Sequence, residues 1–215
     1  MVETKQYGGW ISMTEQEKML AGRLYSASDP FLTQQRLRAR GLVREICQTP
    51  VDAGALRERL FRTLLGAAGK NLMIEPPFRC DYGSNIFIGD NFYANFDCII
   101  LDVCPVTIGD NVLLGPRVCL FTASHPVDPS GRSSGLEFGK PISIGNDVWI
   151  GGGALINPGV TIGNASIIGA GAVVTRDIPD HVIAAGNPCR VVRPVTGEDR
   201  AKWEAMAAQY QSGEV

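Results

Sequence analysis

Branched aliphatic residues recur at every sixth position in the second half of this 215-residue chain. The series consists of Ile144, Ile150, Ile156, Ile162, Ile168 and Val174, and a glycine follows four of its members. A period of six fits neither the alternation of a half-buried strand nor the 3.6-residue period of a helix. The chain must therefore turn at a regular interval, so that each hexapeptide forms one short strand and a corner.

A second register with the same period holds small or β-branched residues. Its members are Val148, Ala154, Val160, Ser166 and Ala172. Such a register is typical of side chains that stack in a narrow interior, and three strands close a triangular coil of about eighteen residues. The glycines after the strands suit corners that need a positive φ or a tight turn. The pattern predicts a mainly β fold, a left-handed parallel β-helix.

The same register is visible earlier in the chain. It runs through Ile88, Ala94 and Ile100 and, after a slip, through Ile108, Leu114 and Leu120. Ser124 to Lys140 is polar and rich in proline and glycine, which predicts a loop that leaves the coil. A long loop in a compact solenoid is more often functional than idle.

Before residue 75 the sequence predicts helices. A capping box of Thr14 and Glu17 begins the first helix, Asp29-Pro30 begins a second to about Cys47, and Thr49-Pro50 begins a third to about Leu65. Glu75-Pro76-Pro77 ends helical structure. We therefore expect a disordered extension over 1–12, a helical cap over 13–74, the β-helix over 75–195 with its loop over 124–140, and a tail over 196–215 with a helix from Glu198 to Gln209.

Composition narrows the classes of function. The net charge of −2 gives no indication of a broad nucleic-acid-binding surface. No segment resembles a signal peptide or a membrane span, so we expect a cytoplasmic protein. The six cysteines lack CxxC spacing, and Cys80 and Cys98 are eighteen apart, as if stacked on one face. They are interpreted as core thiols in a reducing compartment, with a disulfide as the alternative.

A hexapeptide β-helix is compatible with several chemistries: acyl transfer from coenzyme A, zinc-dependent hydration of carbon dioxide as in γ-class carbonic anhydrases, or a non-catalytic scaffold. A catalytic zinc needs three protein ligands, and the only histidines are His125 and His181. His125 stands before Pro126 at the root of the loop, where an imidazole can take the proton of a hydroxyl that attacks a thioester. His181 is expected in a turn, without a catalytic role.

Several motifs, in order, resemble the maltose and galactoside O-acetyltransferases. The resemblance extends from about Thr14 to Arg193, and its motifs lie at 19–25, 82–89, 91–96, 100–105, 124–126, 135–141, 147–151 and 184–191. It implies that His125 is the general base and that Glu137 could orient its imidazole. It also implies that acetyl-CoA is the donor, that no metal is required and that the acceptor is a sugar such as maltose or glucose.

The resemblance also implies two sets of binding residues. The acceptor set is Asn95, Asp81, Tyr82 and Arg36. The coenzyme A set is Trp149, Gly152, Ala170, Thr175, Arg176, Arg190 and Arg193, with Gly152 acting through its backbone N–H and the three arginines converging past the last coils. Direct attack is expected, because no serine or cysteine is visibly paired with a base.

Two departures separate this chain from the galactoside branch, which has aspartates where Ala27 and Val103 stand. Ser26, Asp29 or Asp102 could compensate, whereas the segment Gly135 to Gly139 resembles the maltose branch. The family resemblance implies a homotrimer with sites between subunits. We expect Asn95 and Asp81 of one subunit to meet His125 and Trp149 of its neighbour. A galactoside, an amino acid or an antibiotic is the alternative acceptor.

Overall fold

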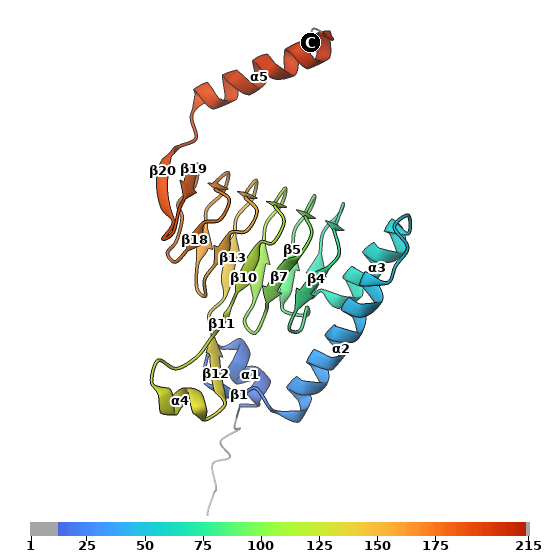
Figure 1. Cartoon of the computed structure of the whole chain (residues 1–215), viewed down its shortest axis with the longest axis vertical. Helices are drawn as coiled ribbons and strands as arrows, with labels where there is room; N and C mark the ends of the chain where they lie inside the picture. The colour runs from blue at the N-terminus through green and yellow to red at the C-terminus, as the bar shows by residue number, and fades with distance from the viewer. Residues whose placement is uncertain (1–12, 214–215) are drawn as a thin grey trace, which may run out of the picture.

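The computed structural model describes residues 13–213, and most of them wind into a parallel β-helix with three flat sheets (Figure 1). Sheet 1 consists of β2 (Ala67–Ala68), β5 (Ile86–Ile88), β8 (Val106–Ile108), β13 (Ile142–Ile144) and β16 (Thr161–Ile162). Sheet 2 consists of β3 (Met73–Ile74), β6 (Tyr93–Ala94), β9 (Leu113–Leu114), β14 (Trp149–Ile150), β17 (Ile167–Ile168) and β19 (Val182–Ala185), with β20 (Arg190–Pro194) antiparallel at its end. Sheet 3 consists of β4 (Phe78–Cys80), β7 (Cys98–Leu101), β10 (Cys119–Phe121), β15 (Leu155–Ile156) and β18 (Val173–Val174).

The six-residue series forms the interior, as predicted. Ile144, Ile150 and Ile156 come from three successive strands, one on each sheet, and each is at most 3% exposed. Each also pairs with the equivalent residue one coil later, as Ile144 does with Ile162. The interior is therefore a continuous stack of branched side chains, and its burial provides the main driving force for the coil.

The glycines after the strands serve a different purpose from the expected one. A Cβ on Gly145 would lie 2.7 Å from Asn164 Oδ1 and 2.9 Å from Asn164 N, although the φ of Gly145 is not positive. The positive φ at this corner belongs instead to residues such as Asn111 (φ 58°) and Asp147 (φ 58°). These glycines are required because successive coils approach each other closely.

Coil length varies along the β-helix. Ile88 pairs with Ile108, twenty residues on, whereas Ile144 pairs with Ile162, eighteen residues on. The expected eighteen-residue coil is therefore correct only for the later coils. Cys98 consequently pairs with Phe78 rather than stacking on Cys80, although both thiols lie on sheet 3 and all six cysteines are free.

All departures from the six-residue period fall at one edge of the β-helix, the corner between sheet 3 and sheet 1, which we call the irregular edge. There the inward series advances eight residues from Ile100 to Ile108 and twenty-four from Leu120 to Ile144. The corners between sheets 2 and 3 keep the period of six, and we call them the glycine edge. They comprise residues 95–97, 115–117, 151–153 and 169–171.

The loop from Ser124 to Lys140 leaves the coil at the irregular edge and contains a short helix, α4 (Pro129–Ser133). Its two ends form strands β11 (Ala123–Ser124) and β12 (Leu136–Gly139), which join β1 (Tyr25–Ser26) in an antiparallel sheet of order β1-β12-β11. The loop is thus anchored to the N-terminal segment below the coils (Figure 1).

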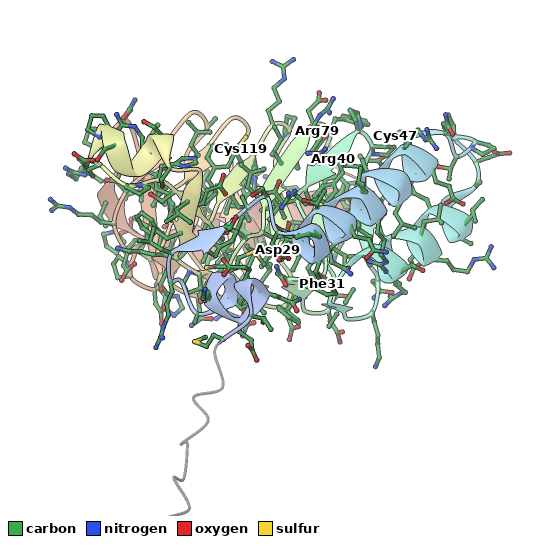
Figure 2. The ribbon with its side chains drawn as sticks, turned by 90° about the horizontal axis from the view of Figure 1, so that it is seen from below. Asp29, Phe31, Arg40, Cys47, Arg79 and Cys119 are labelled. Atoms are coloured by element: carbon green, nitrogen blue, oxygen red, sulfur yellow. The ribbon has the colours of Figure 1, made fainter. Side chains whose placement is uncertain are left out.

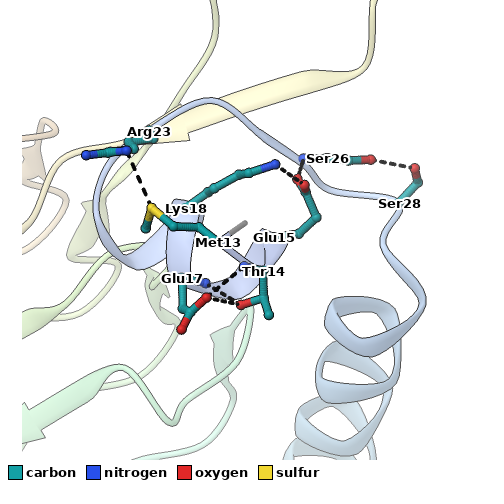
Figure 3. Close-up of polar contacts among 8 residues, drawn as sticks. All are labelled: Met13, Thr14, Glu15, Glu17, Lys18, Arg23, Ser26 and Ser28. Carbon is teal, nitrogen blue, oxygen red and sulfur yellow. Dashed lines mark hydrogen bonds and ion pairs between the residues drawn. The ribbon is translucent and has the colours of Figure 1, made fainter. Parts of the chain in front are cut away.

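Three helices precede the coils: α1 (Glu15–Leu20), α2 (Pro30–Cys47) and α3 (Gly54–Leu64). Helices α2 and α3 lie side by side, and α2 packs on β4 (Figures 1 and 2). The predicted capping box of Thr14 and Glu17 is present, and Glu15 accepts a hydrogen bond from Ser26 N at 2.6 Å, which ties α1 to β1 (Figure 3).

Two predicted boundaries differ from the observed ones. The third helix begins at Gly54 rather than near Pro50. Strands β2 and β3 already pair within the coils, so the β-structure begins at Ala67 and not at residue 75. Among the equivalent inward residues Ala68, Ile74 and Cys80, only Ile74 is a branched aliphatic residue, so the series that identifies the later coils is not recognisable here.

The C-terminal helix α5 (Gly197–Ser212) contains the predicted segment and projects away from the coils (Figure 1). None of its residues is buried. The expectation for residues 1–12 lies outside the described residues. No helix in the described part of the chain has both the length and the apolar character that crossing a bilayer requires.

Candidate active site

A polar cavity of about 240 Å³ opens at the irregular edge, where the N-terminal segment meets the coils. Its lining is Tyr25, Ala27, Arg36, Arg40, Asp81, Tyr82, Val103 and Glu137. Three of the four predicted acceptor residues, Arg36, Asp81 and Tyr82, are therefore brought together with the predicted catalytic Glu137. Asn95 lies elsewhere.

The sheet of β1, β12 and β11 brings the N-terminal segment and the two ends of the loop together beside the cavity. Tyr25 pairs with Glu137, and Ser124 pairs with Phe138. Residues opposite each other on neighbouring strands project to the same face, so Tyr25 and Glu137 share one face of this sheet. His125 directly follows the last residue of β11 and is not among the residues that line the cavity.

Glu137 is held by Tyr25. The Tyr25 hydroxyl donates a hydrogen bond to Glu137 Oε2 at 2.9 Å, and burial, with the nearby Glu137 carboxylate, raises the pKa of Tyr25. Within residues 13–213 no hydrogen bond joins Glu137 to His125, whose side chain is exposed. Tyr25 therefore orients the Glu137 carboxylate.

Arg36 connects helix α2 to the coil. Its Nη1 donates to the Tyr82 hydroxyl at 2.8 Å, and its Nη2 donates to the Ala27 carbonyl at 2.6 Å. Burial raises the pKa of Asp81, although the guanidinium of Arg36 opposes this shift. The cavity therefore presents fixed donors and acceptors of the kind that recognise several hydroxyl groups.

A buried carboxylate, Asp102, holds the corner that carries Asp81 and Tyr82. Asp102 Oδ1 accepts hydrogen bonds from the N–H groups of Asp81 (3.1 Å) and Tyr82 (2.9 Å), and Oδ2 accepts one from Asn85 N (3.2 Å). The side chain is fully buried, and desolvation raises the pKa of Asp102 to about 7 despite these donors.

Both departures from the galactoside branch, Ala27 and Val103, line the cavity. None of the three candidates for compensation is among the residues that line the cavity. Asp102 is turned to backbone groups, Asp29 caps α2 by accepting from Leu32 N, and the Ser26 hydroxyl contacts Ser28. The carboxylates that line the cavity are instead Asp81 and Glu137.

Asn95 and Gly152 lie at the glycine edge, across sheet 3 from the cavity. The Asn95 side chain accepts a hydrogen bond from Phe96 N, and a groove of about 550 Å³ nearby is lined by Phe96, Asp97, Pro116, Arg117, Gly152 and Gly153. Among the described residues no oxygen accepts the Gly152 N–H, whereas the neighbouring Gly151 and Gly153 N–H groups both donate. The Gly152 N–H is therefore available to an external acceptor.

The remaining coenzyme A residues occupy different sides of the last coils. Trp149 is 52% exposed on the outer face of sheet 2, and Ala170 lies at the glycine edge. Thr175 and Arg176 follow β18 at the irregular edge, while Arg190 and Arg193 lie on β20.

The three arginines therefore do not share one corner. Arg193 also forms a bidentate ion pair with Asp199 of α5, at 2.7 and 2.8 Å. Asp199 belongs to the capping box at the start of that helix.

His181 lies in a turn with φ of 56°, far along the chain from the loop of His125. Within the described residues no group of three or more His, Cys, Asp or Glu side chains lies together as a metal site would require.

Two lining residues were not assigned a role from sequence: Tyr25 and Arg40. Tyr25 lies within the N-terminal motif, but its partner is 112 positions away, so no local pattern links the two. Arg40 follows Arg36 by one helical turn, and this spacing could have indicated a shared face.

Three family models match this chain. Residues 18–69 match the maltose acetyltransferase hexapeptide capping motif, residues 105–121 the hexapeptide repeat of succinyl-transferase, and residues 141–176 the bacterial transferase hexapeptide with six repeats.

Similar proteins cover nearly the whole chain. Galactoside O-acetyltransferase of Escherichia coli (strain K12) is 46% identical over 190 residues, which are 88% of this chain and 94% of that protein. The crystal structure of a maltose O-acetyltransferase from Clostridium difficile 630 is 51% identical with a TM-score of 0.85, covering 86% of this chain and 98% of that one. A galactoside acetyltransferase in complex with coenzyme A is 46% identical with a TM-score of 0.85, covering 88% and 94%. On its repeats, its N-terminal motif and these similarities, the chain belongs to the maltose and galactoside O-acetyltransferase family of hexapeptide-repeat acetyltransferases.

Proposed function

We propose that this protein transfers an acetyl group from acetyl-CoA to a hydroxyl of a saccharide, with His125 as the general base. The observation that carries the proposal is a polar cavity lined by Tyr25 and Glu137, with β12, the strand of Glu137, paired to β11 immediately before His125. A base held beside a hydroxyl-binding cavity is what acetyl transfer to an alcohol needs.

The transfer is a direct displacement at the thioester. The acceptor oxygen attacks the carbonyl carbon as the His125 imidazole takes the hydroxyl proton. The tetrahedral intermediate then expels the coenzyme A sulfur, which receives the proton from the imidazolium, giving an O-acetyl sugar and free coenzyme A. Glu137 stabilises the imidazolium that forms between these steps, as an acid partner does in other base-assisted attacks.

Gly152 supplies a donor for the negative charge that develops on the thioester oxygen. Its N–H is unpaired among the described residues and borders a groove at the glycine edge. A backbone donor that is already in place loses no freedom during the reaction, which is why such groups contribute strongly to acyl transfer. Trp149 flanks the pantetheine arm, and Ala170, Arg190 and Arg193 contribute to the nucleotide end, whereas Thr175 and Arg176 lie at the irregular edge, away from this groove.

The acceptor is a maltose-like or glucose-like sugar. Asp81, Tyr82, Arg36 and Glu137 line the cavity with charged and hydroxyl groups, which suit several sugar hydroxyls at once. Ala27 and Val103 reduce the number of carboxylates relative to the galactoside branch. A galactoside, an amino acid or an antibiotic remains the alternative acceptor.

The site is completed between subunits of a homotrimer. The outward residues of sheet 2 form an apolar column, and those of sheet 3 are apolar after Arg79 in the first coil. In the outward column of sheet 1, by contrast, Ala67 and Phe87 are followed by Thr107, Ser143 and Thr161. The sheet 2 column is Met73, Tyr93, Leu113, Trp149, Ile167 and Ile183. Two mainly apolar faces and one more polar face suit a closed ring in which sheet 3 of one subunit approaches sheet 2 of the next.

We propose a different division of the site from the one expected from the sequence. Asp81 lines the same cavity as Glu137 of the loop that also carries His125, while Trp149 and Asn95 belong to sheet 2 and the glycine edge. In the revised scheme, the cavity and His125 come from one subunit, and Asn95, Trp149 and Gly152 come from its neighbour.

The decisive test is release of free thiol from acetyl-CoA with a panel of sugars, amino acids and aminoglycoside antibiotics, compared between the unaltered protein and His125→Ala. Transfer to a sugar hydroxyl that depends on His125 is expected. Transfer to an amine or to no acceptor at all would contradict the proposal.

A further inference from the structure

A second hollow adjoins the acceptor cavity and has no role in the reaction described above. It is a groove of about 480 Å³ between α2 and the first strands of sheet 3, lined by Arg40, Val43, Arg44, Cys47, Pro77, Phe78, Arg79, Cys80, Ile99 and Leu101. Arg40 also lines the acceptor cavity, so this side chain connects the two hollows.

Three arginines give the groove its charge. Arg40 and Arg44 lie one turn apart on α2, and Arg79 lies on β4, the other wall of the groove (Figure 2). No acidic residue lines the groove. In the part of the chain that is described, none of the three arginines belongs to an ion pair.

Positive charge accumulates along this side of α2. Arg36, Arg40 and Arg44 follow one another at intervals of four, and like charges at this spacing repel each other. Arg36 has acceptors in Tyr82 and Ala27, and Arg40 favours the charged form of Asp81 in the acceptor cavity. Arg44 complements the helix dipole in the last turn, whereas strand residue Arg79 has no such role.

The floor of the groove is apolar. Phe78 is 2% exposed, and Ile99 and Leu101 of β7 are partly buried. Arginine guanidinium groups above an apolar floor hold phosphate or carboxylate oxygens in bidentate fashion while a carbon skeleton rests below.

We propose that this groove is an extension of the acceptor cavity that binds an anionic group of the acceptor, so that sugars carrying a phosphate or a carboxylate are preferred over neutral ones. The inference rests on the proposed saccharide acetylation. A sugar ring in the cavity places its hydroxyl near His125 and directs its anionic substituent past Arg40 toward Arg44 and Arg79.

The test compares sugar acceptors that carry an anionic group at C1 or C6 with a neutral one. With the unaltered protein, kcat/KM is measured for glucose, glucose 1-phosphate, glucose 6-phosphate and glucuronic acid. For at least one anionic sugar, kcat/KM is expected to exceed that for glucose by about tenfold or more, mainly through a lower KM. Comparison of the two phosphates with the uronic acid distinguishes recognition of phosphate from recognition of carboxylate. Equal values for all four acceptors would overturn the proposal.

A double variant, Arg44→Gln with Arg79→Gln, locates the effect. The ratio of kcat/KM for the preferred anionic sugar to that for glucose should fall at least about tenfold, and Arg44→Lys with Arg79→Lys should restore part of it. Arg59→Gln, an exposed arginine on α3 outside the groove, is the matched control. An unchanged ratio in the double glutamine variant would overturn the proposal.

A binding measurement keeps the result independent of turnover. Calorimetric titration of the coenzyme A complex with the preferred anionic sugar should show affinity that weakens with salt and is lost in the double glutamine variant. If that variant instead changes the molecular mass of the assembly, the groove is a subunit contact and the proposal fails. If no sugar is acetylated, whatever its charge, the proposed function is wrong. Acetylation of all the sugars without a preference for charge would contradict only the proposed role of the groove.

Discussion

The irregular edge and the glycine edge belong to the same β-helix, yet they solve different problems. At the glycine edge every corner keeps the period of six, and the coils approach so closely that a Cβ on Gly151 would lie 2.5 Å from Ala170 N. At the irregular edge the corners vary in length and hold a loop, a buried carboxylate and a polar cavity.

The contrast teaches where a repeat fold can accommodate a site. Two edges with a constant period keep the interior in register, so the third edge can lengthen without disturbing the stack. The extra residues at the third edge carry Asp81, Tyr82 and Asp102, and the loop carries His125 and Glu137. Function is thus concentrated where the repeat is broken, on a scaffold made rigid by the unbroken corners.

The largest expected effect is chemical. His125→Ala should lower turnover at least about a hundredfold, because the hydroxyl then has no general base, while coenzyme A binding and the unfolding midpoint stay close to normal. Thiol release and calorimetry with coenzyme A measure the two properties. His181→Ala, at a corner outside the site, is the control, and near-normal turnover in His125→Ala would exclude this mechanism.

The next prediction joins the two edges across subunits. Inactive His125→Ala and inactive Asn95→Ala subunits, refolded together in equal amounts, should recover about one quarter of normal activity. Each interface then combines an intact irregular edge with an intact glycine edge in one of four equally frequent pairings. Activity that stays absent after mass measurements confirm exchange would mean that each subunit carries a complete site.

The regular corners should be the more sensitive to added volume. Gly145→Ala is expected to destabilise the protein by about 1–3 kcal/mol, because its Cβ would press on Asn164 of the next coil. Gly41→Ala is the control, since a Cβ there meets nothing within 4 Å and replaces a helical glycine, a change that stabilises by about 0.5–1 kcal/mol. Urea unfolding measures both, and equal effects would refute the close-approach argument.

The irregular edge should make stability depend on pH through Asp102. The pKa of this carboxyl is about 7 in the folded protein and 3.8 ordinarily, so between these values the folded state keeps a proton that the unfolded state releases. The stabilising contribution of the protonated Asp102 carboxyl is complete below pH 3.8. It is lost as the pH rises from 3.8 through 7, and in this interval the free energy of unfolding falls with a slope approaching about 1.4 kcal/mol per pH unit.

Asp102→Asn removes this titration, so its unfolding free energy should fall less steeply than that of the unaltered protein between pH 5 and pH 8. The slopes are compared rather than the absolute values, because the amide also loses an acceptor for backbone N–H groups. Parallel slopes in urea unfolding series would show that Asp102 is ionised throughout this range.

Much of the architecture could be predicted from the sequence because its causes are local. The six-residue period identified the inward residues from Ile144 to Val174, and the capping residues Thr14 and Asp29 identified the starts of two helices. The register slip before Ile108 already marked the corner that departs from the repeat. Residues that pack on a repeated interior, or that cap their own helix, depend on neighbours only a few positions away.

Only the tertiary structure decided which residues meet. Tyr25 reaches Glu137 over 112 positions, Arg36 reaches Tyr82 over 46, and the two edges separate Asn95 from Asp81. Strand β2 is likewise recognised only from its pairing with β5, because its inward residue, Ala68, is not a branched aliphatic residue. The physical reason is that side-chain spacing fixes how one segment folds, whereas contacts between distant segments depend on how the loop, the N-terminal strand and the coils pack together.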